Sequence, residues 1–275
     1  MKSQSVTVAK RIPFRNFGDS CGFLNKTNKT QQTKRKDHTM NGRRLPVYIL
    51  IDVSGSMEGQ PIQAVQSNLE ALFDEVAKDR RLAETAYLSV ITFANDVQQI
   101  VPLSAAGTIS LPDLGAMTAQ HGMTATGDAL VKLCECVDAE VQKSSGAHTG
   151  DYRPVVVMLT DGKSNKGSLA AGIECMRKRH WGRVILAAAG EDASDEELQA
   201  IQGNDKEVYL VVHVESTSAN AIAKFFELVS QSVHRESDIA TTGQDPEAGQ
   251  LPDVLNDPDS GLTLVGASDE PTLDS

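Results

Sequence analysis

The chain has 275 residues, a net charge of −11 and only 4% aromatic residues, which predicts one or two domains with a largely aliphatic core. No apolar run reaches the roughly 18 residues of a membrane-spanning helix, and the start lacks the apolar region of a secretory signal. The cysteines Cys21, Cys134, Cys136 and Cys175 show no disulfide framework and no CxxC spacing, so we expect a cytoplasmic protein without a membrane span.

The first segment of the chain is basic. Residues 1–44 hold 11 Lys or Arg against 2 acidic residues, a net of +9, and show no sustained apolar period. Residues 1–42 are therefore predicted to be a disordered N-terminal extension. The segment lacks the amphipathic period of a membrane arm and the interleaved aromatics of a nucleic-acid arm, so neither partner is expected. Alternatively, residues 1–39 are an upstream extension of a reading frame that starts at Met40.

Residues 43–235 alternate strands with helices and are predicted to form one domain. The expected strands are residues 45–52, 86–93, 97–103, 155–160, 183–189 and 207–212. The expected helices are residues 61–78, 126–143, 169–180, 194–201 and 219–233. This alternation predicts a doubly wound α/β fold, with a mostly parallel six-stranded sheet and helices on both faces. The tight turn at Asn95-Asp96 makes a hairpin, so one strand is expected to run antiparallel.

The last segment, residues 236–275, is acidic. It holds 10 acidic residues and no Lys or Arg, a net of −10, and residues 45–235 carry the remaining net of −10. Its few apolar residues are scattered without a helical or strand period. We therefore expect a disordered acidic C-terminal tail.

Two of the predicted strands end in an aspartate beside hydroxyl side chains. Asp52 ends the first strand and is followed by Ser54 and Ser56, and Asp161 follows the strand at residues 155–160. Carboxyl ends of parallel strands meet at the point where the strand order reverses, and Thr124 precedes a helix that would begin there. Carboxylates and hydroxyls are hard oxygen donors that suit Mg²⁺. Taken singly, each of these residues could also be an ordinary turn former or cap.

The order Asp-x-Ser-x-Ser, then Thr, then Asp-Gly resembles the metal-ion-dependent adhesion site (MIDAS) of von Willebrand factor A (VWA) domains, which have a Rossmann-like fold. Residues 44–52, 188–195 and 225–233 are similar to the TerY-like branch, which is encoded in bacterial tellurium-resistance and stress clusters. The resemblance covers about residues 43–235. The sequence departs from the pattern at Met123, where the family usually has glycine.

This resemblance implies a metal-dependent protein-binding module and no enzyme. Ser54 and Ser56 would bind Mg²⁺ directly, Thr124 directly or through water, and Asp52 and Asp161 mainly through water; Mn²⁺ or Ca²⁺ would be alternatives. An open coordination position would take an Asp or Glu of a protein partner. TerY-like proteins are associated with a protein kinase and a PP2C-like phosphatase, which are therefore the expected partners.

A Mg²⁺-dependent phosphoryl-transfer enzyme using the same ion is the alternative from another class of protein. Other phosphate chemistries lack a required residue. Ser54 occupies the second acidic position of a haloacid-dehalogenase phosphatase motif, and Val157 stands where a P-loop ending in Lys163-Ser164 needs glycine. His121 is the one histidine that could border the metal site, but its position favours a solvated loop residue.

Overall fold

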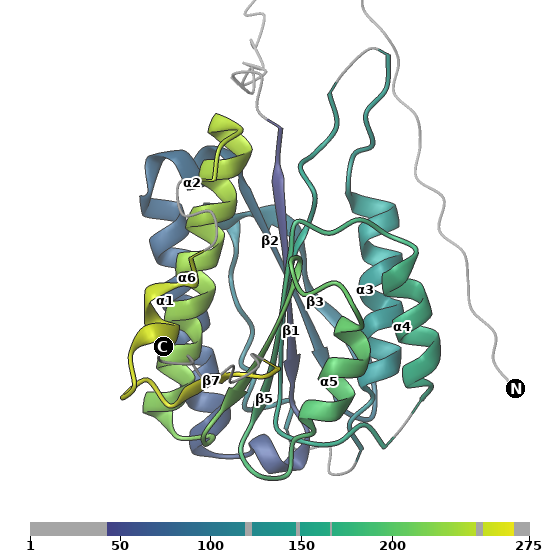
Figure 1. Cartoon of the computed structure of the whole chain (residues 1–275), viewed down its shortest axis with the longest axis vertical. Coiled ribbons are helices and arrows are strands. Elements are labelled where there is room, and N and C mark those ends of the chain that lie inside the picture. The colour runs from purple at the N-terminus through teal and green to yellow at the C-terminus, as the bar shows by residue number, and fades with distance from the viewer. Residues whose placement is uncertain (1–42, 119–122, 147–148, 166, 246–249, 267–275) are drawn as a thin grey trace, which may run out of the picture. The chain divides into compact units, whose positions relative to one another are not determined.

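The computed structural model describes residues 43–118, 123–146, 149–165, 167–245 and 250–266, which build a seven-stranded sheet in the order β3-β2-β1-β4-β5-β6-β7 (Figure 1). The strands are β1 Leu45–Asp52, β2 Ala86–Phe93, β3 Val97–Ala105, β4 Val155–Thr160, β5 Arg183–Ala189, β6 Tyr209–Val214 and β7 Leu262–Leu264. The five central strands are parallel, and the edge strands β3 and β7 are antiparallel to their neighbours. The predicted doubly wound, mostly parallel α/β fold is confirmed.

Helices cover both faces of this sheet (Figure 1). The helices are α1 Gln60–Lys78, α2 Arg80–Thr85, α3 Thr126–Glu140, α4 Leu169–Arg177, α5 Asp195–Gln202, α6 Ala219–Thr242 and α7 Asp253–Asn256. Val47, Ile49 and Ile51 of β1 pack in one apolar cluster with α1, α2 and α6. Tyr48 and Leu50 point the other way, into a second cluster with α3, α4 and α5. Because β1 is buried on both sides, its sequence is an uninterrupted apolar run.

The strand order reverses beside β1. The chain continues from β1 to β2 on one side of the sheet, and later returns to β4 on the other side. In open parallel sheets a crevice forms outside the carboxyl ends of the two strands at such a reversal. The carboxyl ends of β1 and β4 are therefore the place where this fold offers a binding site.

The end of the chain differs from the expected disordered tail. Helix α6 continues to Thr242, and β7 pairs with β6, with Leu262 opposite Val214. Val254 of α7 and Leu262 are nearly completely buried in the core. The prediction was wrong for residues 236–245 and 250–266, and the sheet has a seventh strand. Val254 and Leu262 come from elements of four and three residues, which are too short to show a period.

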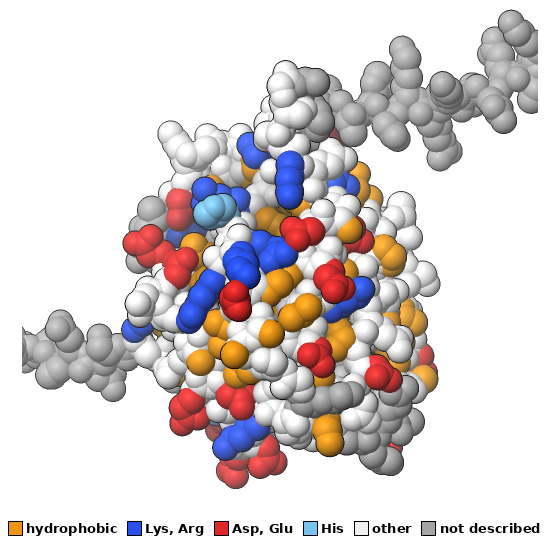
Figure 2. Space-filling view, turned by 90° about the vertical axis from the view of Figure 1, so that its right-hand side faces the viewer, with side chains coloured by type: hydrophobic (Ala, Val, Ile, Leu, Met, Phe, Trp, Pro, Cys, Tyr) orange, Lys and Arg blue, Asp and Glu red, His pale blue; other side chains and the backbone are white. Residues whose placement is uncertain are grey.

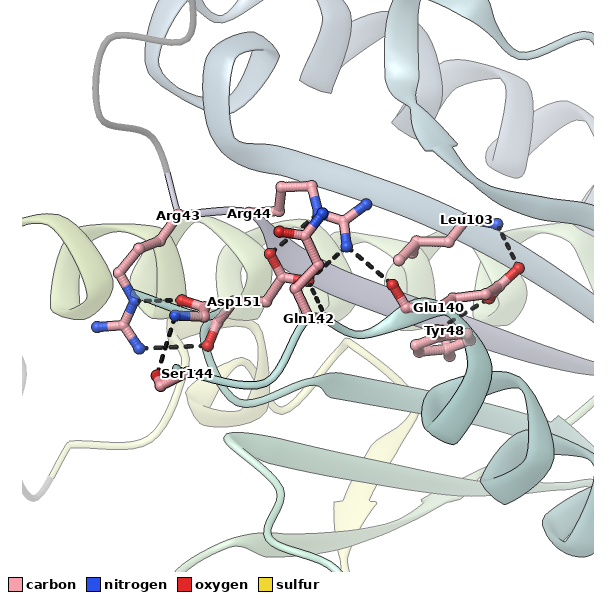
Figure 3. A network of polar contacts seen from close by, with 9 residues as sticks. Arg43, Arg44, Tyr48, Leu103, Glu140, Gln142, Ser144 and Asp151 are labelled. Carbon is pink, nitrogen blue, oxygen red and sulfur yellow. Dashed lines mark hydrogen bonds and ion pairs between the residues drawn. The ribbon is translucent and has the colours of Figure 1, made fainter. Parts of the chain in front are cut away.

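A polar network fixes the opposite end of β1 (Figure 3). The guanidinium of Arg44 forms an ion pair with Asp151 (2.6 Å) and donates to the backbone carbonyl of Glu140 at the end of α3 (2.8 Å). Arg43 donates to the backbone carbonyl of Gly150 (2.8 Å), and the hydroxyl of Tyr48 donates to the Glu140 carboxylate (3.0 Å). The entry to the domain is thus tied to the segment between α3 and β4.

This network leads to a prediction about the domain boundary. A chain that starts at Met40 keeps Arg43 and Arg44, and we expect it to melt at the temperature of the full chain. A chain that starts at Pro46 leaves the Asp151 carboxylate, whose side chain is 3% exposed, without its ion-pair partner. Such a loss typically costs about 3–5 kcal/mol. Thermal unfolding of both chains, followed by circular dichroism, tests this boundary, and a clearly lower melting temperature for the Met40 chain would contradict it.

Met40, Cys21 and His121 lie outside the described residues. None of the helices in the described part of the chain is long and apolar enough to cross a membrane.

Candidate metal centre

The first part of the candidate centre lies where β1 ends. Asp52 is fully buried and accepts hydrogen bonds from the backbone N–H of Ser54 (2.8 Å) and from the hydroxyl of Thr160 (2.7 Å). The chain then forms the short 3-10 helix Gly55–Met57, and the hydroxyl oxygens of Ser54 and Ser56 lie 3.0 Å apart. Because β1 is buried on both faces, these polar groups are held at a fixed position beyond its end.

The second part follows β4. Asp161 comes directly after the last residue of β4 and is 5% exposed. Its carboxylate accepts a hydrogen bond from the hydroxyl of Ser56 (2.8 Å), a residue 105 positions earlier in the chain. The two segments meet because β1 and β4 are hydrogen-bonded neighbours in the sheet. A continuous series of hydrogen bonds therefore connects Asp52, Ser54, Ser56 and Asp161.

The third part is the loop before α3, which carries Thr124. The backbone N–H of Thr124 donates to the side-chain oxygen of Asn165 (2.8 Å), and the backbone N–H of Asn165 donates to the carbonyl of Thr124 (3.1 Å). The Thr124 hydroxyl lies against Gly162, where an added Cβ would stand 3.1 Å from Oγ1. Met123 is 48% exposed, whereas Thr124 is 4% exposed, so the methionine side chain points to solvent and leaves the threonine in place.

The three segments surround an open cavity of about 450 Å³. Ser54, Ser56, Thr124 and Asp161 line this cavity, and Asp52 is hydrogen-bonded beneath them. The structure thus brings together all five residues that the sequence analysis predicts. Further lining residues that the sequence analysis missed are Lys163, Asn165, Glu191 and Asp192. Glu191 and Asp192 follow β5, whose carboxyl end lies beside that of β4, and this position was the signal that could have identified them.

Helix α5 supports the loop that follows Asp161. The hydroxyl of Ser194 accepts a hydrogen bond from the backbone N–H of Glu197 (3.3 Å), which is a helix N-cap. The Glu197 carboxylate does not return to Ser194, as in a reciprocal capping box, but accepts from the backbone N–H of Ser164 (2.8 Å). Glu197 of α5 therefore fixes the loop at the cavity.

Burial dominates the electrostatics of the two carboxylates. Burial raises the pKa of Asp52, and hydrogen bonds from Thr160 and Ser54 oppose this shift. Burial raises the pKa of Asp161 to about 6; the hydrogen bond from Ser56 opposes this, and the negative charge of Asp52 adds to it. Among the described residues, neither carboxylate forms an ion pair with a basic side chain. Two neighbouring buried acids without a counter-charge, beside three hydroxyls, fit a divalent cation.

The raised pKa of Asp161 predicts how stability depends on pH without metal. Because the pKa moves from 3.8 to about 6 on folding, the ionised carboxylate destabilises the folded protein above about pH 6. This penalty disappears as the pH falls toward the unfolded-state value. We expect Asp161→Asn in EDTA to be more stable than wild type at about pH 7.5, with the difference vanishing near pH 4. Urea unfolding across this range measures the effect, and a pH-independent difference would contradict it.

The fold and the site together define a class of protein, namely a doubly wound α/β domain with buried carboxylates and hydroxyls gathered at the reversal of its strand order. The family model described as "von Willebrand factor type A domain" matches residues 47–227, more than half of the 275 residues. The chain belongs to this family, and the VWA resemblance of the sequence is confirmed.

Two curated relatives are similar to part of the chain. Inter-alpha-trypsin inhibitor heavy chain H3 of Mus musculus is 31% identical over 127 residues, and that of Bos taurus is 29% identical over 127 residues. Each match covers 44% of this chain and 13% of the relative. The chain therefore spans only a small part of the length of the curated relatives that it matches.

Several solved structures share the fold. Proximal thread matrix protein 1 from the mussel byssus has 20% identity and a TM-score of 0.51, over 70% of this chain and 48% of its own. A von Willebrand factor type A protein from Catenulispora acidiphila also has 20% identity and a TM-score of 0.51, over 69% and 43%. Another structure of the mussel protein, at 22% identity, a TM-score of 0.50 and coverage of 70% and 48%, has a zinc-occupied MIDAS motif. At these identities the likeness shows the fold alone.

Proposed function

We propose that this chain is a metal-dependent protein-interaction module whose metal centre binds an acidic side chain of a partner. Ser54, Ser56 and Thr124 hold Mg²⁺, and Asp52 and Asp161 supply the negative charge behind them. The observation that carries this proposal is the pair of buried carboxylates at the base of an open, hydroxyl-lined cavity, neither of which has a basic ion-pair partner in the part of the chain that the structure describes. A bound divalent cation supplies the positive charge that attracts a carboxylate.

The residues around the cavity favour binding over catalysis. The described lining includes no histidine or cysteine, so the hydroxyls of Ser54 and Ser56 have only carboxylates beside them as possible general bases. Lys163 and Asn165 could contact a phosphate group, which keeps a Mg²⁺-dependent phosphoryl-transfer enzyme as the second candidate function. Glu191 and Asp192 on the same rim would repel that phosphate. They would not repel a protein partner that carries basic residues beside its acidic one.

The finer assignment is to the TerY-like branch, with a protein kinase and a PP2C-like phosphatase as partners in a cytoplasmic stress or tellurium-resistance system. Its support is the similarity of residues 44–52, 188–195 and 225–233 to that branch. Residues 44–52 include β1 and residues 188–195 include the β5–α5 loop at the cavity, so two of the three segments belong to the proposed site.

The test combines metal titration with partner capture. Isothermal titration of the EDTA-treated chain with Mg²⁺, Mn²⁺ and Ca²⁺ identifies the metal. Capture from a lysate of the native host, in Mg²⁺ and in EDTA, should recover partners only in Mg²⁺. Ser56→Ala should abolish this capture, whereas Ser104→Ala, at a half-buried position on the edge strand β3 that does not line the cavity, should not.

Metal-independent capture would contradict the proposed function. Phosphatase and ATPase assays with Mg²⁺ or Mn²⁺ separate the second candidate. Turnover by the wild type that is lost in Ser56→Ala would replace the binding module with an enzyme.

A further inference from the structure

Helices α3 and α4 lie side by side on one face of the sheet (Figure 1) and contact each other. Near their beginnings, an added Cβ on Gly172 would stand 3.0 Å from the Cβ of Leu130. Near their ends, Arg179 forms an ion pair with Asp138 (2.5 Å), 41 residues earlier in the chain. Side chains about 41 residues apart are therefore opposite each other along the two helices.

Cys134 of α3 and Cys175 of α4 lie between these two contacts. They are also 41 residues apart, and both pack in the same apolar cluster between the two helices and the sheet. Both are free; Cys134 is buried and Cys175 is half-buried, so a small solute reaches the sulfur of Cys175 first. The third described cysteine, Cys136, is two residues further along α3, which turns it to a different side of the helix.

A cation lies beside the more accessible thiol. The guanidinium of Arg179 donates to the backbone carbonyl of Cys175 (2.7 Å) and lies 3.1 Å from its Sγ. Reactive cysteines are found in partly exposed surroundings with such a cation nearby. Figure 2 views the α3 and α4 side of the molecule, where acidic, basic and apolar side chains are interleaved over the surface.

We propose that Cys134 and Cys175 are a reversible oxidation site that forms a disulfide between α3 and α4. With hydrogen peroxide as the oxidant, the Cys175 sulfur attacks one peroxide oxygen and becomes a sulfenic acid, and the other oxygen leaves as water after protonation. Cys134 then attacks the Cys175 sulfur, so the S–S bond forms while the S–O bond breaks. The Cys134 proton leaves with the second water, and a dithiol reverses the reaction.

This cross-link would join the two helices that follow the loops of the candidate metal centre. Helix α3 begins two residues after Thr124, and α4 begins after the loop that contains Asp161. We therefore expect the oxidised chain to melt at a higher temperature than the reduced chain, because a covalent bond restricts the unfolded state.

The experiment uses the full chain carrying Cys21→Ser, which removes the one thiol outside the described residues. Treatment with hydrogen peroxide, followed by mass spectrometry without reduction, should show the loss of two hydrogens and a cross-linked pair of peptides containing Cys134 and Cys175. Cys134→Ser and Cys175→Ser should each abolish the cross-link, and Cys136→Ser should leave it unchanged. Dithiothreitol should restore the free thiols.

Arg179→Gln tests the role of the cation and should slow cross-linking several-fold. Lys178→Gln is the matched control, because Lys178 pairs with Glu174 on the surface and should leave the rate unchanged. A disulfide that involves Cys136 would overturn the proposal. Glutathione in the same solution is the reference for oxidation: if it is fully oxidised while Cys134 and Cys175 remain free thiols, the proposal is also overturned.

Discussion

Replacing Asp52 with asparagine is expected to lower the affinity for Mg²⁺ by about 10–100-fold and to leave the metal-free domain folded. The carboxylate is fully buried, and burial raises its pKa, so its charge weakens the metal-free protein. Asparagine keeps an oxygen that can accept from Ser54 or Thr160 but removes the charge that a cation needs. Melting temperatures with and without Mg²⁺ should show a large shift for wild type and a small one for the variant.

Asp96→Asn is the control for this substitution. Asp96 lies in the turn after β2, whose carboxyl end is at the same edge of the sheet, but it is exposed and does not line the cavity. It should keep the full Mg²⁺ shift. If Asp52→Asn and Asp96→Asn respond to Mg²⁺ equally, Asp52 is not part of a metal centre.

Ending the chain after Asp245 is expected to destabilise the domain by about 3–6 kcal/mol. This truncation removes α7 and β7, and with them the nearly completely buried side chains of Val254 and Leu262. It also exposes the edge of β6, while the ion pair between Asp245 and Arg235 remains possible. Urea unfolding of the full and shortened chains measures the loss.

A point substitution separates this effect from truncation in general. Leu262→Ser should reproduce part of the loss, whereas Thr263→Ser, at the exposed position next to it, should have little effect. If the full and shortened chains are equally stable, α7 and β7 do not contribute to the stability of the domain.

The sequence identified the parts of this molecule whose signals are local. Strands β1, β2, β4 and β5 begin and end where they are predicted, because each is an apolar run bounded by polar or turn residues. The five site residues meet as expected because the ends of β1 and β4 are fixed by the parallel sheet. The additional cavity residues Glu191 and Asp192 were missed, since their relevance depends on the neighbouring strand and not on their own segment.

The charge of the C-terminal segment was misread for a physical reason. Counted within its own segment, every carboxylate lacks a cation, which is typical of a disordered tail. In the folded chain, Glu236 pairs with Arg183, and Asp238 pairs with Arg81 at a distance of 157 residues in sequence. A count along the chain has no means of finding partners that are brought together only by the fold.

The position of β1 also has a mechanical consequence. Its amino end is held by Arg43 and Arg44, and its two neighbours β2 and β4 are parallel to it along most of its length. A pull on the chain at Arg43 would load the ladders on both sides of β1 in shear, so that many hydrogen bonds share the force and cannot open one after another. Tension at this point would be resisted by the same central strand that carries Asp52 at its far end.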